Sequence, residues 1–286
     1  MKKNRVILVS IVSNSALIAF KIIAGILMSS IAVLSEAIHS SIDLLAAVVA
    51  YIAIAKADEP ADRLHPFGHG KFENISGFFE ALLIFFAAGI IVAEAIHKLI
   101  HPSVALVRLD WGIGVMAISA FVNVAVSRML FYSAKKHGSI AIEADAMHLG
   151  ADVITSLGVM LGLVVIRFTH VVALDPIIAI VMACFILRAS IDLTLRSIAD
   201  LADQKLPDSE IRVIETIIHG YPEITSYHKL RTRKSGSRRE IDLHIQVDGD
   251  TSLPVAHELC FKVENAVKAA FPGAYVTIHV EPRATG

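Results

Sequence analysis

The sequence predicts an α-helical membrane protein with six membrane-spanning helices, followed by a small α+β domain. Three observations lead to this prediction. Apolar residues make up 55% of the 286 residues, above the roughly 45 to 50% of ordinary soluble proteins, and the mean hydropathy is +0.64. Six apolar stretches are each long enough to cross about 30 Å of hydrocarbon. After residue 200, charged residues become frequent and the apolar runs shorten.

The six expected spans form a transmembrane domain over residues 1–200. The first two spans are separated by a tight turn at Met28-Ser29-Ser30. Pro176 begins the last span, where its missing N–H is harmless. The spans are expected over residues 6–28, 31–55, 76–99, 111–133, 141–167 and 176–199.

Basic residues concentrate on one side of the predicted membrane: before the first span, between the second and third, and near the junction of the fourth and fifth. They are Lys2, Lys3, Arg5, Lys56, Arg63, Lys71, Arg128, Lys135 and Lys136. The positive-inside rule therefore predicts a multi-pass protein with both termini in the cytoplasm. The bacterial inner membrane is the expected location, because the chain is compact and has no long extramembrane insertion.

The remaining residues, 201–286, are expected to form a two-layer α+β domain of order αββαβ. A helix is predicted over 207–219, because Pro and Asp stand at its start. Strands are predicted over 225–233 and 239–247, since apolar and polar residues alternate in the second of them. An amphipathic helix after Pro254 and a last strand over 274–280 complete the order.

Charge and cysteine content exclude several classes of protein. The formal net charge is −1, which argues against a nucleic-acid partner, because such binding needs a concentrated basic face. Only Cys184 and Cys260 occur, far apart in the sequence, so neither a disulfide framework nor a thiolate zinc site is indicated. No small-residue cleavage signature follows the first apolar segment, which is therefore expected to stay as a span.

Two copies of one spacing, His39-x3-Asp43 and His148-x3-Asp152, lie inside predicted spans. Residues four apart share a helix face, so each pair offers an imidazole nitrogen and a carboxylate oxygen to one point. An ionisable side chain in the bilayer costs at least roughly 2.5 to 3.5 kcal/mol, which points to function. Either pair alone is equally consistent with a hydrogen bond to a neighbouring helix. Two identical pairs instead favour one tetrahedral site with the ligands that Zn²⁺ accepts.

Further candidate ligands lie outside the spans. Asp62, His65 and His69 share a loop rich in Pro and Gly between the second and third spans, and a solvated loop without metal is an equally good interpretation. The tail carries His228, His244, His257, His279 and Glu281 on predicted strands and a helix. Ordinary surface histidines are the competing interpretation there. Glu36 and Asp145 each precede a ligand histidine by three residues and are expected either to support the ligands or to bind directly.

Together these features resemble the cation diffusion facilitator family, whose members export divalent transition metals. The resemblance covers nearly the whole chain and depends on the order and spacing of several motifs. They are the two intramembrane pairs, His65-Pro66-Phe67-Gly68-His69-Gly70-Lys71, Asp203-Gln204-x-Leu206-Pro207, Leu230-Arg231-Thr232-Arg233 and His279-x-Glu281.

The resemblance implies roles for these residues. His39, Asp43, His148 and Asp152 would form the transport site, in the His form that is similar to members favouring zinc over cadmium. Asp62, His65 and His69 match a loop site. His228, His244, His257, His279 and Glu281 match a cytoplasmic binuclear site, although members often have Asp where Glu281 stands. Lys71 and Asp203 match a charge pair at the interface of a homodimer, and the tail resembles a metallochaperone-like domain that senses metal and dimerises.

The predicted function is Zn²⁺ efflux from the cytoplasm in exchange for protons, by alternating access. Imidazole has an ordinary pKa of about 6.5 and must be deprotonated to bind Zn²⁺, so the metal and protons compete for His39 and His148. Zn²⁺ is expected both as cargo and as a regulatory ligand of the tail. Export of Fe²⁺, Cd²⁺, Co²⁺ or Mn²⁺ by the same fold is the nearest alternative, and a metal-gated channel is another. An enzyme is not expected, because four protein ligands leave no coordination position for a reactive water.

Overall fold

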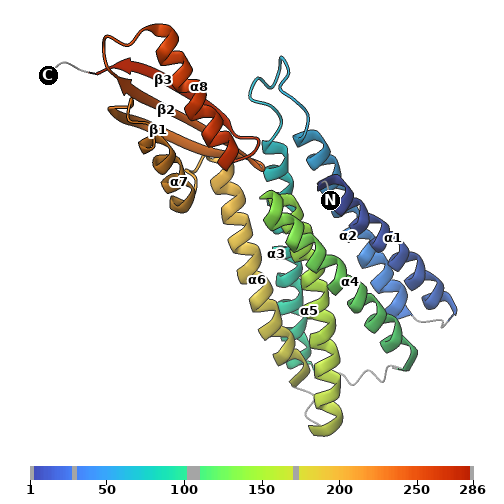
Figure 1. Cartoon of the computed structure of the whole chain (residues 1–286). Coiled ribbons are helices and arrows are strands. Elements are labelled where there is room, and N and C mark those ends of the chain that lie inside the picture. The colour runs from blue at the N-terminus through green and yellow to red at the C-terminus, as the bar shows by residue number, and fades with distance from the viewer. Residues whose placement is uncertain (1–2, 28–30, 102–109, 170–173, 284–286) are drawn as a thin grey trace. The chain divides into compact units, whose positions relative to one another are not determined.

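The structure is a computed structural model of the whole chain (Figure 1). It describes residues 3–27, 31–101, 110–169 and 174–283. Within the helices, the side chains of residues 31–39, 42, 43 and 158–169, with a few others, lie outside this description. The chain divides into two compact units, Met1–Ile198 and Ala199–Gly286.

The first unit contains six long helices, one for each predicted span. Among the described residues, four segments have the length and hydropathy to cross a membrane: Arg5–Ala24, Lys71–His97, Ala117–His137 and Pro176–Leu201. The prediction of a helical membrane domain is therefore confirmed. The six helices are α1 (Lys3–Leu27), α2 (Ile31–Ala57), α3 (Lys71–Ile100), α4 (Asp110–His137), α5 (Ile140–Thr169) and α6 (Leu174–Leu201).

Small residues allow these helices to pack closely. A Cβ atom on Gly77 of α3 would lie 3.0 Å from the Cγ2 atom of Ile140 on α5, so glycine brings these two backbones together. Ala81 and Ala144 are fully buried in the same contact. Small interface residues are typical of membrane helix pairs. Large apolar side chains such as Phe86 and Phe185 instead remain exposed on the outside of the unit, as a lipid-facing surface requires.

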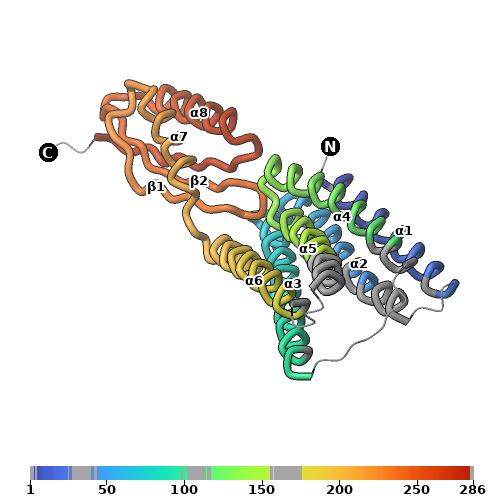
Figure 2. Tube along the Cα trace, turned by 90° about the horizontal axis from the view of Figure 1, so that it is seen from below, coloured from blue at the N-terminus to red at the C-terminus, as the bar shows by residue number. Residues whose placement is uncertain are grey.

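The second unit has the predicted order αββαβ (Figure 2). Strand β1 pairs antiparallel with β2, and β3 pairs parallel with the other edge of β2. The sheet order is therefore β1-β2-β3, with the middle strand flanked on both sides. The elements are α7 (Asp208–His219), β1 (Ser226–Ser235), β2 (Arg238–Val247), α8 (Leu253–Ala270) and β3 (Tyr275–Pro282).

Alternation along β2 decides which face of the sheet is covered. Every second side chain, from Ile241 to Val247, is buried in one cluster with residues of α7 and α8, such as Ile214 and Val263. The intervening residues, including His244, point to the opposite face and are only half-buried, as the two-residue period of a strand requires. His244 and its ladder partners His228 and His279 therefore lie on the face of the sheet without helices.

Candidate metal sites

Half of the predicted transport site lies among the described side chains. His148 and Asp152, four residues apart on α5, are both half-buried. The side chains of His39 and Asp43 on α2 lie outside the description, so the meeting of all four ligands remains a prediction. The two helices do pack together, because Ala50 of α2 belongs to the same buried cluster as α5 residues.

Several polar groups are buried inside the membrane unit that contains His148. Lys21 of α1 is almost fully buried and its Nζ donates a hydrogen bond of 2.8 Å to Ser40 Oγ of α2, next to His39 in sequence. Ser127 Oγ of α4 donates to the carbonyl oxygen of Ala146 over 2.8 Å. This interior is polar enough to receive an ion. Other buried polar side chains are Ser10, Asn14, Glu80, Asn123 and Asp145.

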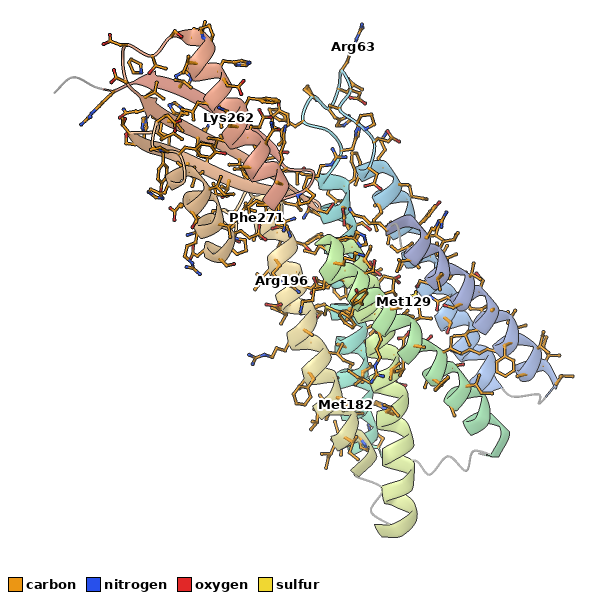
Figure 3. The ribbon with its side chains drawn as sticks, in the orientation of Figure 1. Arg63, Met129, Met182, Arg196, Lys262 and Phe271 are labelled. Atoms are coloured by element: carbon orange, nitrogen blue, oxygen red, sulfur yellow. The ribbon has the colours of Figure 1, made fainter. Side chains whose placement is uncertain are left out.

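The loop between α2 and α3 brings together the three predicted ligands Asp62, His65 and His69, whose donor atoms lie within 4.8 Å of one another. The backbone N–H groups of Leu64 and His65 donate to Asp62 Oδ1 over 2.8 and 2.6 Å. The same oxygen lies 3.3 Å from His65 Nδ1. The loop thus folds around the Asp62 carboxylate, while the side chain of Arg63 points outward from the loop (Figure 3).

Hydrogen bonds donated by backbone N–H groups favour the charged form of the Asp62 carboxyl. The N–H of His65 is the main cause that lowers the pKa of the Asp62 carboxyl. His69 is buried in the loop just before α3, and its ring lies 4.4 Å from the ring of His65. An anionic carboxylate beside two imidazoles is a donor set suited to Zn²⁺.

The exposed face of the sheet holds a second group of donors. His244 Nδ1 lies 2.7 Å from Glu281 Oε1, and His228 Nε2 lies 3.1 Å from Glu281 Oε2. The ring of His279 lies 4.6 Å from that of His244. The side-chain hydrogen bond with His244 is the main reason that the pKa of Glu281 is lowered. Three strands therefore contribute to one cluster.

Strand register explains this cluster. His228 and His244 are partners in the β1–β2 ladder, and His244 and His279 are partners in the β2–β3 ladder. A bulge follows His228, where Lys229 has a positive φ of 51°. His257 is not part of this cluster. It is exposed on α8, and the three residues whose donor atoms meet are His228, His244 and Glu281.

Comparison with known proteins identifies the family. Residues 7–202 match the family model of the cation efflux transmembrane domain, and residues 206–283 match that of the cytoplasmic domain of cation efflux proteins. The chain belongs to the cation diffusion facilitator family. It is therefore a multi-pass cation-efflux transporter rather than an enzyme.

Two similar transporters span almost the same length as this chain. An uncharacterized transporter of Synechocystis sp. is 34% identical over 274 residues, which cover 96% of this chain and 88% of the relative. The cation-efflux pump FieF of Klebsiella pneumoniae is 30% identical over 268 residues, covering 94% and 89%. The metal-bound C-terminal domain of the CzcD transporter from Thermotoga maritima is 30% identical and covers 27% of this chain and 93% of that domain, with a TM-score of 0.26.

The predicted interface pair of this family member is Lys71 and Asp203. Lys71 is the first residue of α3, and Asp203 follows α6 with a positive φ of 59°. Asp203 Oδ2 accepts a hydrogen bond of 3.1 Å from Arg233 Nη1. The Asp203 carboxylate thus has a partner within its own unit, and its pairing with Lys71 remains a prediction.

One buried acidic residue of the transporter was not predicted from the sequence as a site residue. Glu80 lies in the apolar run of α3 and is almost fully buried. A signal was present, because an acidic residue inside a predicted span is unusual. Its position beside α5 is not encoded by any spacing within α3, so only the fold reveals its neighbours.

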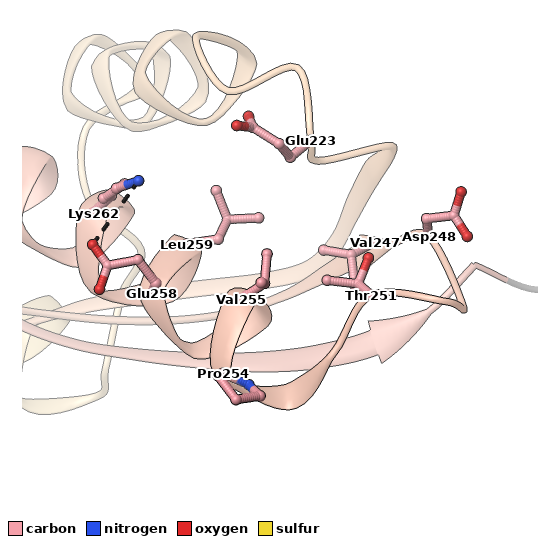
Figure 4. A pocket seen from close by; sticks show the side chains of 9 residues that line it. All are labelled: Glu223, Val247, Asp248, Thr251, Pro254, Val255, Glu258, Leu259 and Lys262. Carbon is pink, nitrogen blue, oxygen red and sulfur yellow. Dashed lines mark ion pairs between the residues drawn. The ribbon is translucent and has the colours of Figure 1, made fainter.

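The second unit also has a hollow of about 570 Å³ (Figure 4). Leu259 and Val255 of α8 form part of its lining, and Lys262 Nζ lies 3.9 Å from Glu258 Oε1 at its edge. The carboxylates here do not converge into a group of metal donors among the described residues. The hollow is therefore separate from the metal clusters of this unit.

Proposed function

We propose that this transporter exports Zn²⁺ from the cytoplasm in exchange for protons, by alternating access at His39, Asp43, His148 and Asp152. The observation that carries the proposal is the repeated His-x3-Asp spacing on two helices that pack together. Two neutral imidazoles and two carboxylates form a neutral complex with a divalent cation, which lowers the cost of holding that ion in a membrane.

Ligand type supports Zn²⁺ over some other cargoes. The two imidazole ligands disfavour Mn²⁺, which prefers carboxylate, carbonyl and water ligands. Four protein donors match the tetrahedral preference of Zn²⁺. Fe²⁺, Cd²⁺ and Co²⁺ are the competing cargoes, and their transport must be compared directly.

Competition at the histidines supplies the coupling to protons. Zn²⁺ binds only to deprotonated imidazole, so an ion that binds to His148 displaces a proton. When the site faces a more acidic exterior, protons displace Zn²⁺. Each cycle then moves the metal in one direction and protons in the other.

The other clusters have supporting roles in this proposal. The Asp62 loop is a second Zn²⁺ site, and the sheet cluster with Glu281 is a regulatory site on the cytoplasmic domain. Zn²⁺ bound by these domains in a homodimer would stabilise the dimer by mass action and bias transport. This arrangement corresponds to an inner-membrane protein with both termini in the cytoplasm.

Flux measurements in proteoliposomes test the proposal. Purified protein is reconstituted with a pH-sensitive dye inside the vesicles, and Zn²⁺, Cd²⁺, Fe²⁺, Co²⁺ or Mn²⁺ is added outside in turn. The expected result is metal uptake with proton release that is fastest for Zn²⁺ and responds to the imposed proton gradient. Metal uptake that is indifferent to the gradient would instead indicate a passive channel.

A further inference from the structure

Glu80 is an acidic side chain in the interior of the membrane unit. It is 3% exposed, and neither carboxylate oxygen has a hydrogen-bond partner among the described residues. Burial of a carboxylate without compensation is costly, because the charged form loses its hydration. A residue kept in this environment points to a ligand that is bound for part of the functional cycle.

Glu80 faces α5. Gly77, one turn before it, contacts Ile140, and Ala81 packs with Ile140 and Ala144. Ile84, one turn after Glu80, packs in a cluster with Met147 of α5. Because residues three and four apart share a helix face, Glu80 lies opposite the turn of α5 that contains Asp145 and His148. Both ionisable side chains are near enough to Glu80 for their charges to influence it.

Asp145 is a second buried acid at the same level. Its side chain is 2% exposed, and its Oδ2 atom has no hydrogen-bond partner among the described residues. Ser10 of α1, which is fully buried, faces the carboxyl group of Asp145. Two acids on different helices therefore direct unsatisfied oxygen atoms into one buried region.

This region lies between one end of the helix bundle and the predicted transport ligands. The contacts of α3 with α5 advance together along both helices, so both begin at the same end, where the Asp62 loop precedes α3. With a rise of about 1.5 Å per residue, Asp145 lies about 8 Å along α5 from Ile140. His148 lies about one turn deeper and Asp152 about two turns deeper than Asp145.

We propose that Glu80 and Asp145 form a second position for a divalent cation, on the loop side of His148, which passes the ion to His148 and Asp152. The proposal rests on the proposed function, since it assumes that those residues are transport ligands. Two carboxylates balance the double charge of the ion, and oxygen donors tolerate several coordination numbers. An ion held there is one helical turn from its next nitrogen ligand.

Neutral variants test this position without creating a cavity. Glu80→Gln and the double variant Glu80→Gln with Asp145→Asn are reconstituted, and the KM and maximal rate of Zn²⁺ uptake are measured. The expected result is a rise in KM of about 10- to 100-fold, the range found when groups that support a metal site are removed. Glu80→Asp, which keeps the carboxylate, should recover part of the affinity. Glu94→Gln, an exposed acid elsewhere on α3, is the matched control and should keep the wild-type KM.

Thermal stability separates this role from a structural one. Without metal, Glu80→Gln should have a Tm equal to or above that of the wild type, because a neutral amide avoids the cost of burying a charge. The rise in Tm caused by added Zn²⁺ should be smaller in the variant. A KM within about twofold of wild type in both neutral variants would overturn the proposal, and so would a lower metal-free Tm with an unchanged KM.

Asp152→Asn, measured in parallel, distinguishes an error in the proposed transport site from an error in the second cation position. If Asp152→Asn keeps normal Zn²⁺ flux, the proposed transport site itself is wrong. If it abolishes flux while the Glu80 variants keep the wild-type KM, only the second cation position is wrong.

Discussion

Nε2 of His69 lies 3.3 Å from Oδ2 of Asp62, although the histidine is buried and the aspartate is half-exposed. The other ring nitrogen, Nδ1, lies 3.2 Å from the carbonyl oxygen of Pro60. A carbonyl oxygen only accepts hydrogen bonds, so Nδ1 carries a proton, and Nε2 is the ring atom that would bind a metal ion together with Asp62. The separation is close to the roughly 3.3 Å between two ligands of a tetrahedral Zn²⁺ ion with bonds of about 2.0 to 2.1 Å.

Asp62→Asn should separate the structural role of this residue from metal binding. The amide oxygen of Asn still accepts the two backbone N–H groups, so the loop should keep its shape. Loss of the negative charge should weaken Zn²⁺ binding at the loop by about tenfold or more, as measured by isothermal titration calorimetry on the full chain. Asp58→Asn is the control in the same loop region. Unchanged binding in Asp62→Asn would show that the loop is not a Zn²⁺ site.

Asp152→Ala should abolish transport and leave the protein folded. Removal of a group that only supports a metal ligand already lowers metal affinity or activity by about 10- to 100-fold. Loss of a direct ligand should therefore reduce Zn²⁺ flux by at least about a hundredfold. Flux in proteoliposomes and the elution profile in size-exclusion chromatography check the two parts of this prediction. Asp192→Asn, at an exposed acid of α6, should transport normally. Normal flux in Asp152→Ala would remove the central assignment.

Zn²⁺ should stabilise the second unit on its own. Residues 199–286 form a compact unit with their own buried core, so the fragment is expected to fold. At a free Zn²⁺ concentration of a hundred times Kd, binding should add about 2.7 kcal/mol to the free energy of unfolding, measured by thermal denaturation.

Variants locate the origin of this stabilisation. His244→Ala should remove it, because His244 is central to the cluster of the three strands. His219→Ala should not, because His219 instead lies at the end of α7 and bonds the carbonyl oxygen of Glu215. Equal stabilisation of the His244 variant would contradict the regulatory site.

The metal-free fragment should lose stability in acid through Glu210. Arg239 donates two hydrogen bonds, of 3.0 and 2.9 Å, to the carboxylate of Glu210. These hydrogen bonds are the main cause that lowers the pKa of Glu210. Because the folded-state pKa is depressed, the stabilisation is complete above the ordinary value of 4.5 and is lost as pH falls through the lower folded-state value. After solvent screening it should amount to about 1 kcal/mol.

Urea unfolding at pH 7 and pH 3 measures this effect. Glu210→Gln should be less stable than wild type at pH 7 and should show a smaller loss at pH 3. Glu223→Gln, at an exposed acid, should follow the wild type at both values of pH. A wild-type pH dependence in Glu210→Gln would assign the acid sensitivity to other groups.

Local patterns in the sequence predicted most of the elements. Each expected span corresponds to a helix, because the apolar length needed to cross a bilayer is a property of one continuous segment. The third helix begins at Lys71 rather than near residue 76, since its polar first turn, with Glu73 and Asn74, is buried within the fold and not in lipid. The order αββαβ followed from the change of period between helix and strand.

The sequence by itself determined which segments are helices or strands and which ligand types share a helix face, as with His148 and Asp152, because these properties depend on neighbours three or four residues away. Only the tertiary structure decided that Glu281 meets His228 and His244, and that Glu80 lies opposite Asp145. Those contacts join segments far apart in the chain. Their partners are set by strand register, a bulge and the close approach of α3 and α5 at Gly77, which no local period encodes.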